Sequence, residues 1–338
     1  MSLSYSPIFF LLGTILNWLV IVDVVSTNTT KIGEGILTKW WQQKVCFVSF
    51  YCYRCFRDRA ILVWAGSFIV LGMVVLWILL LWLGWIAIFC TSENAVVSSS
   101  TQQPADFWAR VYFAGFSISG LGTGDFVPQG AFWQVFTAVA SLNGLVLTSL
   151  IIGFIVPIAQ AEAYRRQIAL QIFYTGQTAQ DLLLHTWNPQ HKTVLEPLLR
   201  DIADKLVKLD QNHASFPMLH RFCNYRLKES IILAIASLDE ALTIAEFAME
   251  QECSCSFSLA RRAISGYLCS SRKLGIEPGR KVPPPPSLDS LRQAQILVVS
   301  DRLWQKRLES LQQRRQHLLS LVEQSGWSWK QVVSNKLE

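Results

Sequence analysis

Two long stretches without a single charged residue constrain this chain more than any other feature. Residues 61–90 and 126–161 contain no Asp, Glu, Lys or Arg, and both are rich in large apolar side chains. A helix of about 20 apolar residues is long enough to cross the hydrocarbon core of a bilayer. Buried helices of soluble proteins rarely run this long without a charge, so we expect membrane-spanning helices at 61–90 and 131–160.

A third, shorter apolar stretch lies at the N-terminus. Residues 1–22 carry no charge, and 9–22 are apolar apart from two polar side chains. A cleaved signal peptide is the alternative interpretation, but it would place basic residues ahead of its apolar core. The first basic residue, Lys31, comes after the stretch. We therefore expect residues 1–26 to form a retained N-terminal transmembrane helix, the first of three.

The composition agrees with a membrane protein. The chain is 51% hydrophobic and only 16% charged, whereas soluble globular proteins carry about 25% charged residues. Such a hydrophobic chain excludes intrinsic disorder, which needs low hydrophobicity and high charge. The net charge of +6 is mild for 338 residues and gives no reason to expect a nucleic-acid partner.

Basic residues in the loops predict the orientation of the spans, because cytoplasmic loops are enriched in Lys and Arg. Segment 91–125 contains Arg110 as its only basic residue. Segment 27–60 contains six basic residues: Lys31, Lys39, Lys44, Arg54, Arg57 and Arg59. We expect 27–60 to be a basic cytosolic linker, with the N-terminus and 91–125 outside the cell membrane.

The outward segment contains three glycines at alternate positions, Gly120, Gly122 and Gly124, followed by Asp125. Glycine adopts positive φ without a Cβ penalty, so such a loop can turn successive carbonyl groups to one side. Carbonyl oxygens in that arrangement replace the hydration shell of a cation in a selectivity filter. A nucleotide-binding glycine loop is the alternative, but it needs a different spacing and a strand before it. The loop therefore favours an ion pathway.

On these residues the chain resembles potassium channels of the pore-domain type, in which two membrane helices flank a re-entrant pore loop. Residues 112–128 read YFAGFSISGLGTGDFVP, close to the run YFSFVTLTTVGYGDIVP that is usual in that family. The resemblance covers residues 61–160 and implies an outer helix at 61–90, a pore helix and filter at 107–125, and an inner helix at 131–160. It also implies a homotetramer around one pore, with ions bound at Gly120, Leu121, Gly122, Thr123 and Gly124.

Two filter positions depart from the family pattern. Gly120 stands where the family has a threonine whose hydroxyl contributes to the innermost ion site, and Thr123 stands where it has an aromatic ring that braces the filter. We therefore predict a cation pore that passes potassium with weaker selectivity than the family norm, and a non-selective pore that also passes sodium is the alternative. A potassium-to-sodium permeability ratio above about one hundred would contradict weakened selectivity.

Residues around the filter supply further expectations. Asp125 would form an acidic ring at the outer mouth, or alternatively bond to the pore helix. Arg110 is expected at the periphery of the pore helix, paired with Asp106. Gly144 follows Gly124 by 20 residues, which is the place of a hinge glycine in the family, with close helix packing as its alternative role. One helical face would line the cavity through Ser141, Leu145, Thr148 and Ile152.

The rest of the chain, 161–338, has the charge content of a soluble domain and apolar residues at helical spacing. We expect a cytosolic helical domain with a proline-rich linker near 278–287, followed by one helix from about 287 to 323. Pro157 would kink or end the inner helix ahead of this domain. The sequence does not identify the ligand or partner of 161–338.

The predicted class is an all-α membrane protein whose function is cation conduction. A membrane-anchored signalling or scaffold protein is the alternative, although it leaves the glycine loop unexplained. An enzyme would need a convergent set of acids, bases or metal ligands, and the sequence offers none. We accordingly expect a protein embedded in the lipid bilayer, with no enzymatic activity and no cofactor. We expect no metal beyond the permeant potassium, or sodium.

Overall fold

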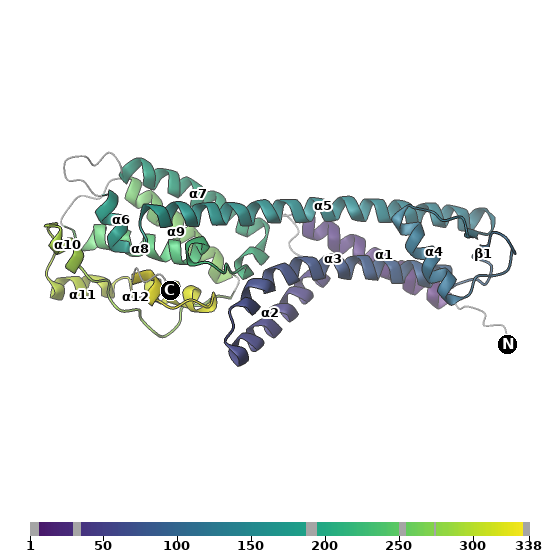
Figure 1. Ribbon diagram of the computed structural model, residues 1–338, viewed down its shortest axis with the longest axis horizontal. Helices are drawn as coiled ribbons and strands as arrows, with labels where there is room; N and C mark the ends of the chain where they lie inside the picture. Colours follow the sequence, from purple (N-terminus) through teal and green to yellow (C-terminus); the bar gives the residue numbers. More distant parts are fainter. Residues whose placement is uncertain (1–6, 30–34, 187–194, 250–254, 274, 334–338) are drawn as a thin grey trace. The chain divides into compact units, whose positions relative to one another are not determined.

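The computed structural model describes residues 7–29, 35–186, 195–249, 255–273 and 275–333 (Figure 1). The described chain is mostly helical. It divides into two compact units: Met1–Phe47 with Ser67–Pro157, and Val48–Gly66 with Ile158–Glu338. We refer to them as the N-terminal unit and the C-terminal unit.

Three helices in the described residues are long and apolar enough to cross a membrane. They are α1 (Pro7–Asn28), α3 (Ala60–Phe89) and α5 (Gly130–Thr175), of 22, 30 and 46 residues. Together with the helical fold they confirm the predicted class, an all-α membrane protein with three membrane helices.

These three helices pack against one another in the N-terminal unit. A Cβ atom on Gly13 of α1 would lie 2.4 Å from the carbonyl oxygen of Gly84 on α3, so glycine is what allows the two backbones to approach. Between α3 and α5, the rings of Trp77 and Phe154 lie 5.2 Å apart in an edge-on arrangement. Both rings are fully buried, and they fill the space between the two long helices.

The expected linker at 27–60 is wrong in part, because it contains helix α2 (Ile36–Phe56). The buried carboxylate of Asp23 caps this helix: it accepts hydrogen bonds from the backbone of Leu37 (2.7 Å) and Thr38 (3.2 Å). Such bonds satisfy amide groups that have no partner within the helix and favour its start. We did not predict α2 because the basic residues of this segment suggested a linker. The residue that caps the helix, Asp23, belongs to another helix, α1.

A two-stranded sheet, which the sequence did not predict, has one strand before the predicted pore helix and one after the glycines. Strand β1 (Val96–Ser98) pairs antiparallel with β2 (Phe126–Pro128), with Val97 opposite Val127. The strands are too short to give a periodic pattern, so only their pairing reveals them. The sheet connects the loop after α3 to the residues that follow the glycines.

The C-terminal unit contains the helices that follow α5. In chain order they are α6 (Ala179–Thr186), α7 (Leu195–Ser215), the 3₁₀ turns η1 (Pro217–Arg221) and η2 (Leu227–Glu229), α8 (Ile231–Phe247), α9 (Cys255–Lys273), α10 (Asp289–Gln293), α11 (Asp301–Glu309), α12 (Gln312–Gln324) and α13 (Lys330–Val333). Helix α8 is buried along almost its whole length and forms the centre of the unit's core.

Of the two effects expected of Pro157, a kink or an end of the inner helix, the structure excludes the end. Helix α5 continues through this residue to Thr175. Its last turns are held in the C-terminal unit by the buried side chains of Ile168 and Ile172. Arg165, also buried, donates hydrogen bonds to the carbonyl oxygens of Leu219 (2.6 Å) and Phe222 (3.0 Å). These contacts stabilise the helix beyond the proline.

The single helix expected from about 287 to 323 is also wrong, because the chain forms α10, α11 and α12 in its place. After α10, Gln295 adopts a positive φ of 58°, which no continuous helix allows. Val299 then donates its N–H to the carbonyl oxygen of Ala248, at 2.9 Å, just after α8. Tertiary pairing with the core therefore overrides the helical period of this segment.

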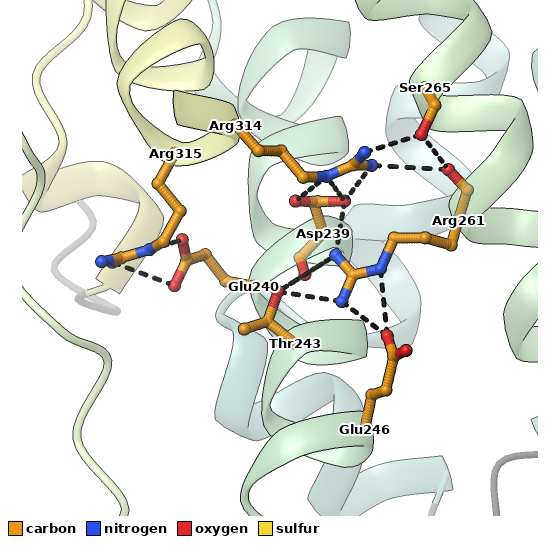
Figure 2. A network of polar contacts seen from close by, with 8 residues as sticks. All are labelled: Asp239, Glu240, Thr243, Glu246, Arg261, Ser265, Arg314 and Arg315. Atoms are coloured by element: carbon orange, nitrogen blue, oxygen red, sulfur yellow. Dashed lines mark hydrogen bonds and ion pairs between the residues drawn. The ribbon is translucent and has the colours of Figure 1, made fainter. Parts of the chain in front are cut away.

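A buried ion network connects α8 to the helices around it (Figure 2). Asp239 pairs with Arg261 of α9 (3.0 Å) and with Arg314 of α12 (2.6 Å). Glu240 pairs with Arg315 of α12 at 2.7 Å. Burial disfavours a charged carboxylate, but the two arginines beside Asp239 outweigh burial and lower its pKa. The network fixes α12 and α9 on the buried helix.

Two histidines of this unit contact each other in the interior. Nδ1 of His213 and Nε2 of His220 are 2.9 Å apart, and both rings lie beside Tyr267. Burial, reinforced by the positive charge of Arg165, lowers the pKa of His220 to about 3 and that of His213 well below its ordinary value. The folded protein therefore holds both rings neutral.

This arrangement predicts that acid destabilises the C-terminal unit. When folding lowers the pKa of a group, the folded protein loses stability as pH falls below the pKa of that group in the unfolded chain, because only the unfolded chain then binds the proton. For histidine the unfolded pKa is about 6.5. With its folded pKa at about 3, His220 costs about 2 kcal/mol of stability between pH 7.5 and 5, and His213 acts in the same direction. We expect the melting temperature of the full chain to fall over that interval. H220Q should reduce the slope, and H185Q, at an exposed histidine, should leave it unchanged; equal slopes in all three proteins would contradict the assignment.

Candidate functional site

The short helix expected after residue 107 is present as α4 (Phe107–Ser119), between α3 and α5 in the chain and beside one end of both in the fold (Figure 1). Asp106 caps its N-terminus by accepting a hydrogen bond from the N–H of Ala109 at 2.7 Å. Gly120 ends it in the left-handed conformation, with φ 73°. The helix therefore delivers the chain directly into the glycine segment.

Arg110 is buried in α4 rather than peripheral, which corrects our expectation. Its guanidinium donates hydrogen bonds to the carbonyl oxygens of Ala105 (3.0 Å), Phe89 (3.2 Å) and Glu93 (2.9 Å). These carbonyls come from the end of α3 and from the loop that leads to α4. Arg110 thus fixes the start of α4 against the end of α3, a role that required tertiary contacts to recognise.

The glycine segment has alternating backbone conformations. Gly120, Gly122 and Gly124 have φ values of 73°, 56° and 78°, whereas Leu121 and Thr123 between them are not in the positive-φ region. A left-handed residue at every second position allows successive carbonyl groups to point to one side of the chain. A side chain at any of the three positions would be strained.

The same segment lies open in the single chain. A Cβ atom on Gly122 or Gly124 would meet no atom within 4 Å, and Leu121 is 73% exposed. At the inner start of the segment, a Cβ on Gly120 would lie 3.7 Å from the hydroxyl of Ser141 on α5. The structure therefore brings the predicted filter and one of the predicted cavity residues together.

Asp125 is bonded to α4, which was the alternative role foreseen for it. The hydroxyl of Tyr112 donates to its carboxylate at 3.3 Å, and the N–H of Ser99 donates to its carbonyl oxygen at 2.9 Å. The carboxylate remains exposed. It is therefore held in position at the end of the glycine segment while its charge faces solvent.

Gly144 lies against the C-terminal end of α4. A Cβ atom on this residue would lie 1.7 Å from the carbonyl oxygen of Ile118 and 2.6 Å from its carbonyl carbon. No repositioning of a side chain relieves such a contact, because the clash is with backbone. The geometry therefore gives Gly144 the role that was the alternative to a hinge: it allows α5 to pack closely against α4.

The remaining predicted cavity residues occupy the exposed side of α5. Leu145 and Ile152 are 65% and 58% exposed, and Thr148 is exposed as well. The hydroxyl of Thr148 donates to the carbonyl oxygen of Gly144 at 2.9 Å. This face of α5 is free to meet another chain, lipid or water.

Comparison with known proteins gives three results. Residues 75–160 match the model of a protein family described as ion channels. The chain is 28% identical over 291 residues to a protein of Bacillus subtilis (strain 168) described as the uncharacterized membrane protein YdjJ, and the match covers 84% of this chain and 85% of that protein. No solved structure matches the chain.

The matched segment contains the second half of α3, all of α4, the glycine segment and the first part of α5. The match therefore supports an ion channel, and it agrees with a protein that is not an enzyme. The relative similarly supports a membrane protein.

Proposed function

We propose that this chain is the subunit of a homotetrameric cation channel in which the backbone of Gly120–Gly124 forms the filter, with potassium as the preferred ion. α3 is its outer helix, α4 its pore helix and α5 its inner helix. The N-terminus and the filter face the outside of the cell membrane, and the C-terminal unit faces the cytoplasm, in keeping with the basic residues of 27–60. The pore needs no cofactor.

The alternating backbone of the glycine segment carries this proposal. An exposed run of carbonyl groups with positive φ at every second residue suits coordination of a dehydrated cation. It follows a capped helix between two membrane helices, within the segment that matches an ion-channel family. Irregular backbone at membrane depth is stable only where it is buried in protein or lines a water-filled path.

A non-selective cation channel is the second candidate, and two residues favour it. Gly120 offers no hydroxyl for an inner ion site, and Thr123 is exposed and leaves no ring to brace the filter. The rings of Tyr112 and Phe116 on α4 lie 4.5 Å apart. We propose potassium preference supported by the backbone, with weaker discrimination against sodium.

A reversal potential tests this proposal. Purified full-length protein in a planar bilayer is exposed to potassium on one side and sodium on the other. A reversal potential shifted toward the potassium equilibrium potential supports potassium preference, and a reversal near zero with clear current supports the non-selective pore. Absence of current from folded, oriented protein would favour the membrane-anchored scaffold.

Removing the charge of Asp125 should reduce current in dilute salt. D125N keeps an oxygen that accepts the Tyr112 hydrogen bond but removes the carboxylate that concentrates cations at the pore mouth. We expect single-channel current to fall roughly two- to threefold near 10 mM potassium and to recover near 1 M, where charges are screened within about 3 Å. E93Q, at an exposed glutamate of the outward segment, is the control. A loss of current that is independent of salt would contradict the electrostatic role.

A further inference from the structure

A large cleft in the C-terminal unit is lined by positive charge. Its volume is about 1120 Å³, and its walls include the basic side chains of Arg59, Arg226, Lys228 and Lys330. No acidic side chain occurs among the described residues that line it. Four cations converging on one cleft repel each other, so their arrangement favours an anionic occupant.

Neutralisation within the protein is slight. Arg226 pairs with Glu229 at 3.7 Å, but the Arg226 side chain is 68% exposed, and such a pair is weak. Within the described part of the chain, neither Lys228 nor Lys330 forms a salt bridge. These three side chains therefore keep most of their positive charge available for a ligand.

Two contacts hold Arg59 at the wall of this cleft. Its guanidinium carbon lies 3.2 Å from the ring centroid of Trp327, and it donates a hydrogen bond to the carbonyl oxygen of Asn224 at 3.0 Å. Its Nε atom is buried, and among the described residues it has no hydrogen-bond partner. Gly326 brings the tryptophan into place through its positive φ of 75°. Stacking thus orients the arginine and leaves one of its donors unused.

Aromatic rings give the cleft a second character. Tyr174 and Tyr225 line it and are 72% and 70% exposed, and Phe173 and Trp327 also contribute to its walls. Exposed tyrosines offer flat apolar faces that stack on a planar or hydrocarbon group, with hydroxyls at the rim. The cleft therefore combines cations for an anionic head with rings for an apolar portion, as ligand sites commonly do.

We propose that this cleft is a binding site for a phosphate-bearing ligand. A phosphate group carries up to two negative charges on oxygens that accept hydrogen bonds from Arg and Lys, which matches the donors present better than a single carboxylate does. The phosphate comes either from a soluble phosphorylated molecule with a flat ring or from the headgroup of an anionic lipid. This inference concerns binding alone and does not depend on conduction.

The cleft also adjoins two of the long helices. Arg59 directly precedes α3, and Phe173 and Tyr174 belong to the last turn of α5. A ligand there would contact the ends of both helices within the C-terminal unit. Its phosphate would bind the basic residues and its apolar part would lie against the rings.

Binding to full-length protein tests the proposal, with two probes that separate the sources of phosphate. Isothermal titration calorimetry uses adenosine triphosphate as the soluble probe and dioctanoyl phosphatidylglycerol as the lipid probe, at low salt in a neutral detergent. R226Q/K228Q removes two charges from the cleft, and R280Q/K281Q removes two from exposed residues elsewhere.

We expect at least one probe to bind the wild type and the R280Q/K281Q control equally. Its dissociation constant should rise at least about tenfold in R226Q/K228Q, the effect of losing one or two charge-assisted contacts. Binding of the nucleotide alone identifies a soluble ligand, and binding of the lipid alone identifies a headgroup; both support the site. The proposal would be overturned if neither probe binds the wild type, or if the affinity falls equally in R226Q/K228Q and in R280Q/K281Q.

Discussion

Replacing Gly144 with alanine should destabilise the N-terminal unit and strongly reduce conduction. The new Cβ atom would lie 1.7 Å from the carbonyl oxygen of Ile118, so α4 and α5 must move apart. Overpacking against side chains costs about 1–3 kcal/mol, and backbone yields less readily. Because Ile118 lies two residues before Gly120, the separation would displace the start of the proposed filter. We expect potassium flux into proteoliposomes to fall at least about tenfold.

The same helix offers a matched control. A Cβ atom on Gly153 would approach nothing closer than 3.7 Å, which is an ordinary contact with Asn28. G153A makes the same chemical change in α5 and should retain both thermal stability and flux. If G144A proved as stable and as conductive as G153A, the close packing of α4 on α5 would be contradicted. A hinge role alone would permit G144A to fold with unchanged stability and to alter only gating.

Replacing Asp239 with asparagine should destabilise the C-terminal unit strongly. The buried carboxylate of Asp239 accepts from Arg261 and Arg314 together, and asparagine keeps its shape but not its charge. Removing one partner of a buried ion pair costs about 3–5 kcal/mol. In D239N, Arg314 would lose the carboxylate that it pairs with, and Arg261 would keep its pair with Glu246. We expect faster hydrogen exchange of the α8 amides in the full-length protein and a lower melting temperature.

An exposed ion pair in the same unit supplies the comparison. Asp289 pairs with Arg292 at 3.5 Å and its side chain is 75% exposed. Such surface pairs contribute at most about 1 kcal/mol, so D289N should leave exchange in α8 unchanged. Similar exchange in D239N and the wild type would show that the network of Figure 2 does not hold α8 in the core.

The membrane helices were predictable because their signal is local. An uncharged apolar stretch such as 61–90 is most stable in the hydrocarbon core of a membrane. Its length is enough for a helix that spans a bilayer. The backbone of the glycine segment was predictable for a similar reason, because glycine readily adopts positive φ. Gly120, Gly122 and Gly124 all have positive φ. The sequence also allowed two roles for Asp125, and the bond from Tyr112 realises one of them.

The errors have a common cause in contacts between distant residues. Helix α2 begins where Asp23 of α1 caps it, and the segment after α10 bends because Val299 bonds to Ala248. Neither partner is near in sequence, so no periodicity reports the contact. Arg110 was misplaced for the same reason, because its three carbonyl partners are gathered only by the fold. The pattern of the sequence likewise gave no sign of the basic cleft around Arg59.

The reversal potential of the purified protein in a tenfold gradient of potassium chloride tests the proposed cation conduction most directly. A pore lined by backbone carbonyls and an acidic mouth passes potassium and excludes chloride. The account predicts a reversal near the potassium equilibrium potential, about 59 mV in magnitude for a tenfold gradient of a singly charged ion. Reversal near the chloride equilibrium potential, of opposite sign, would contradict it.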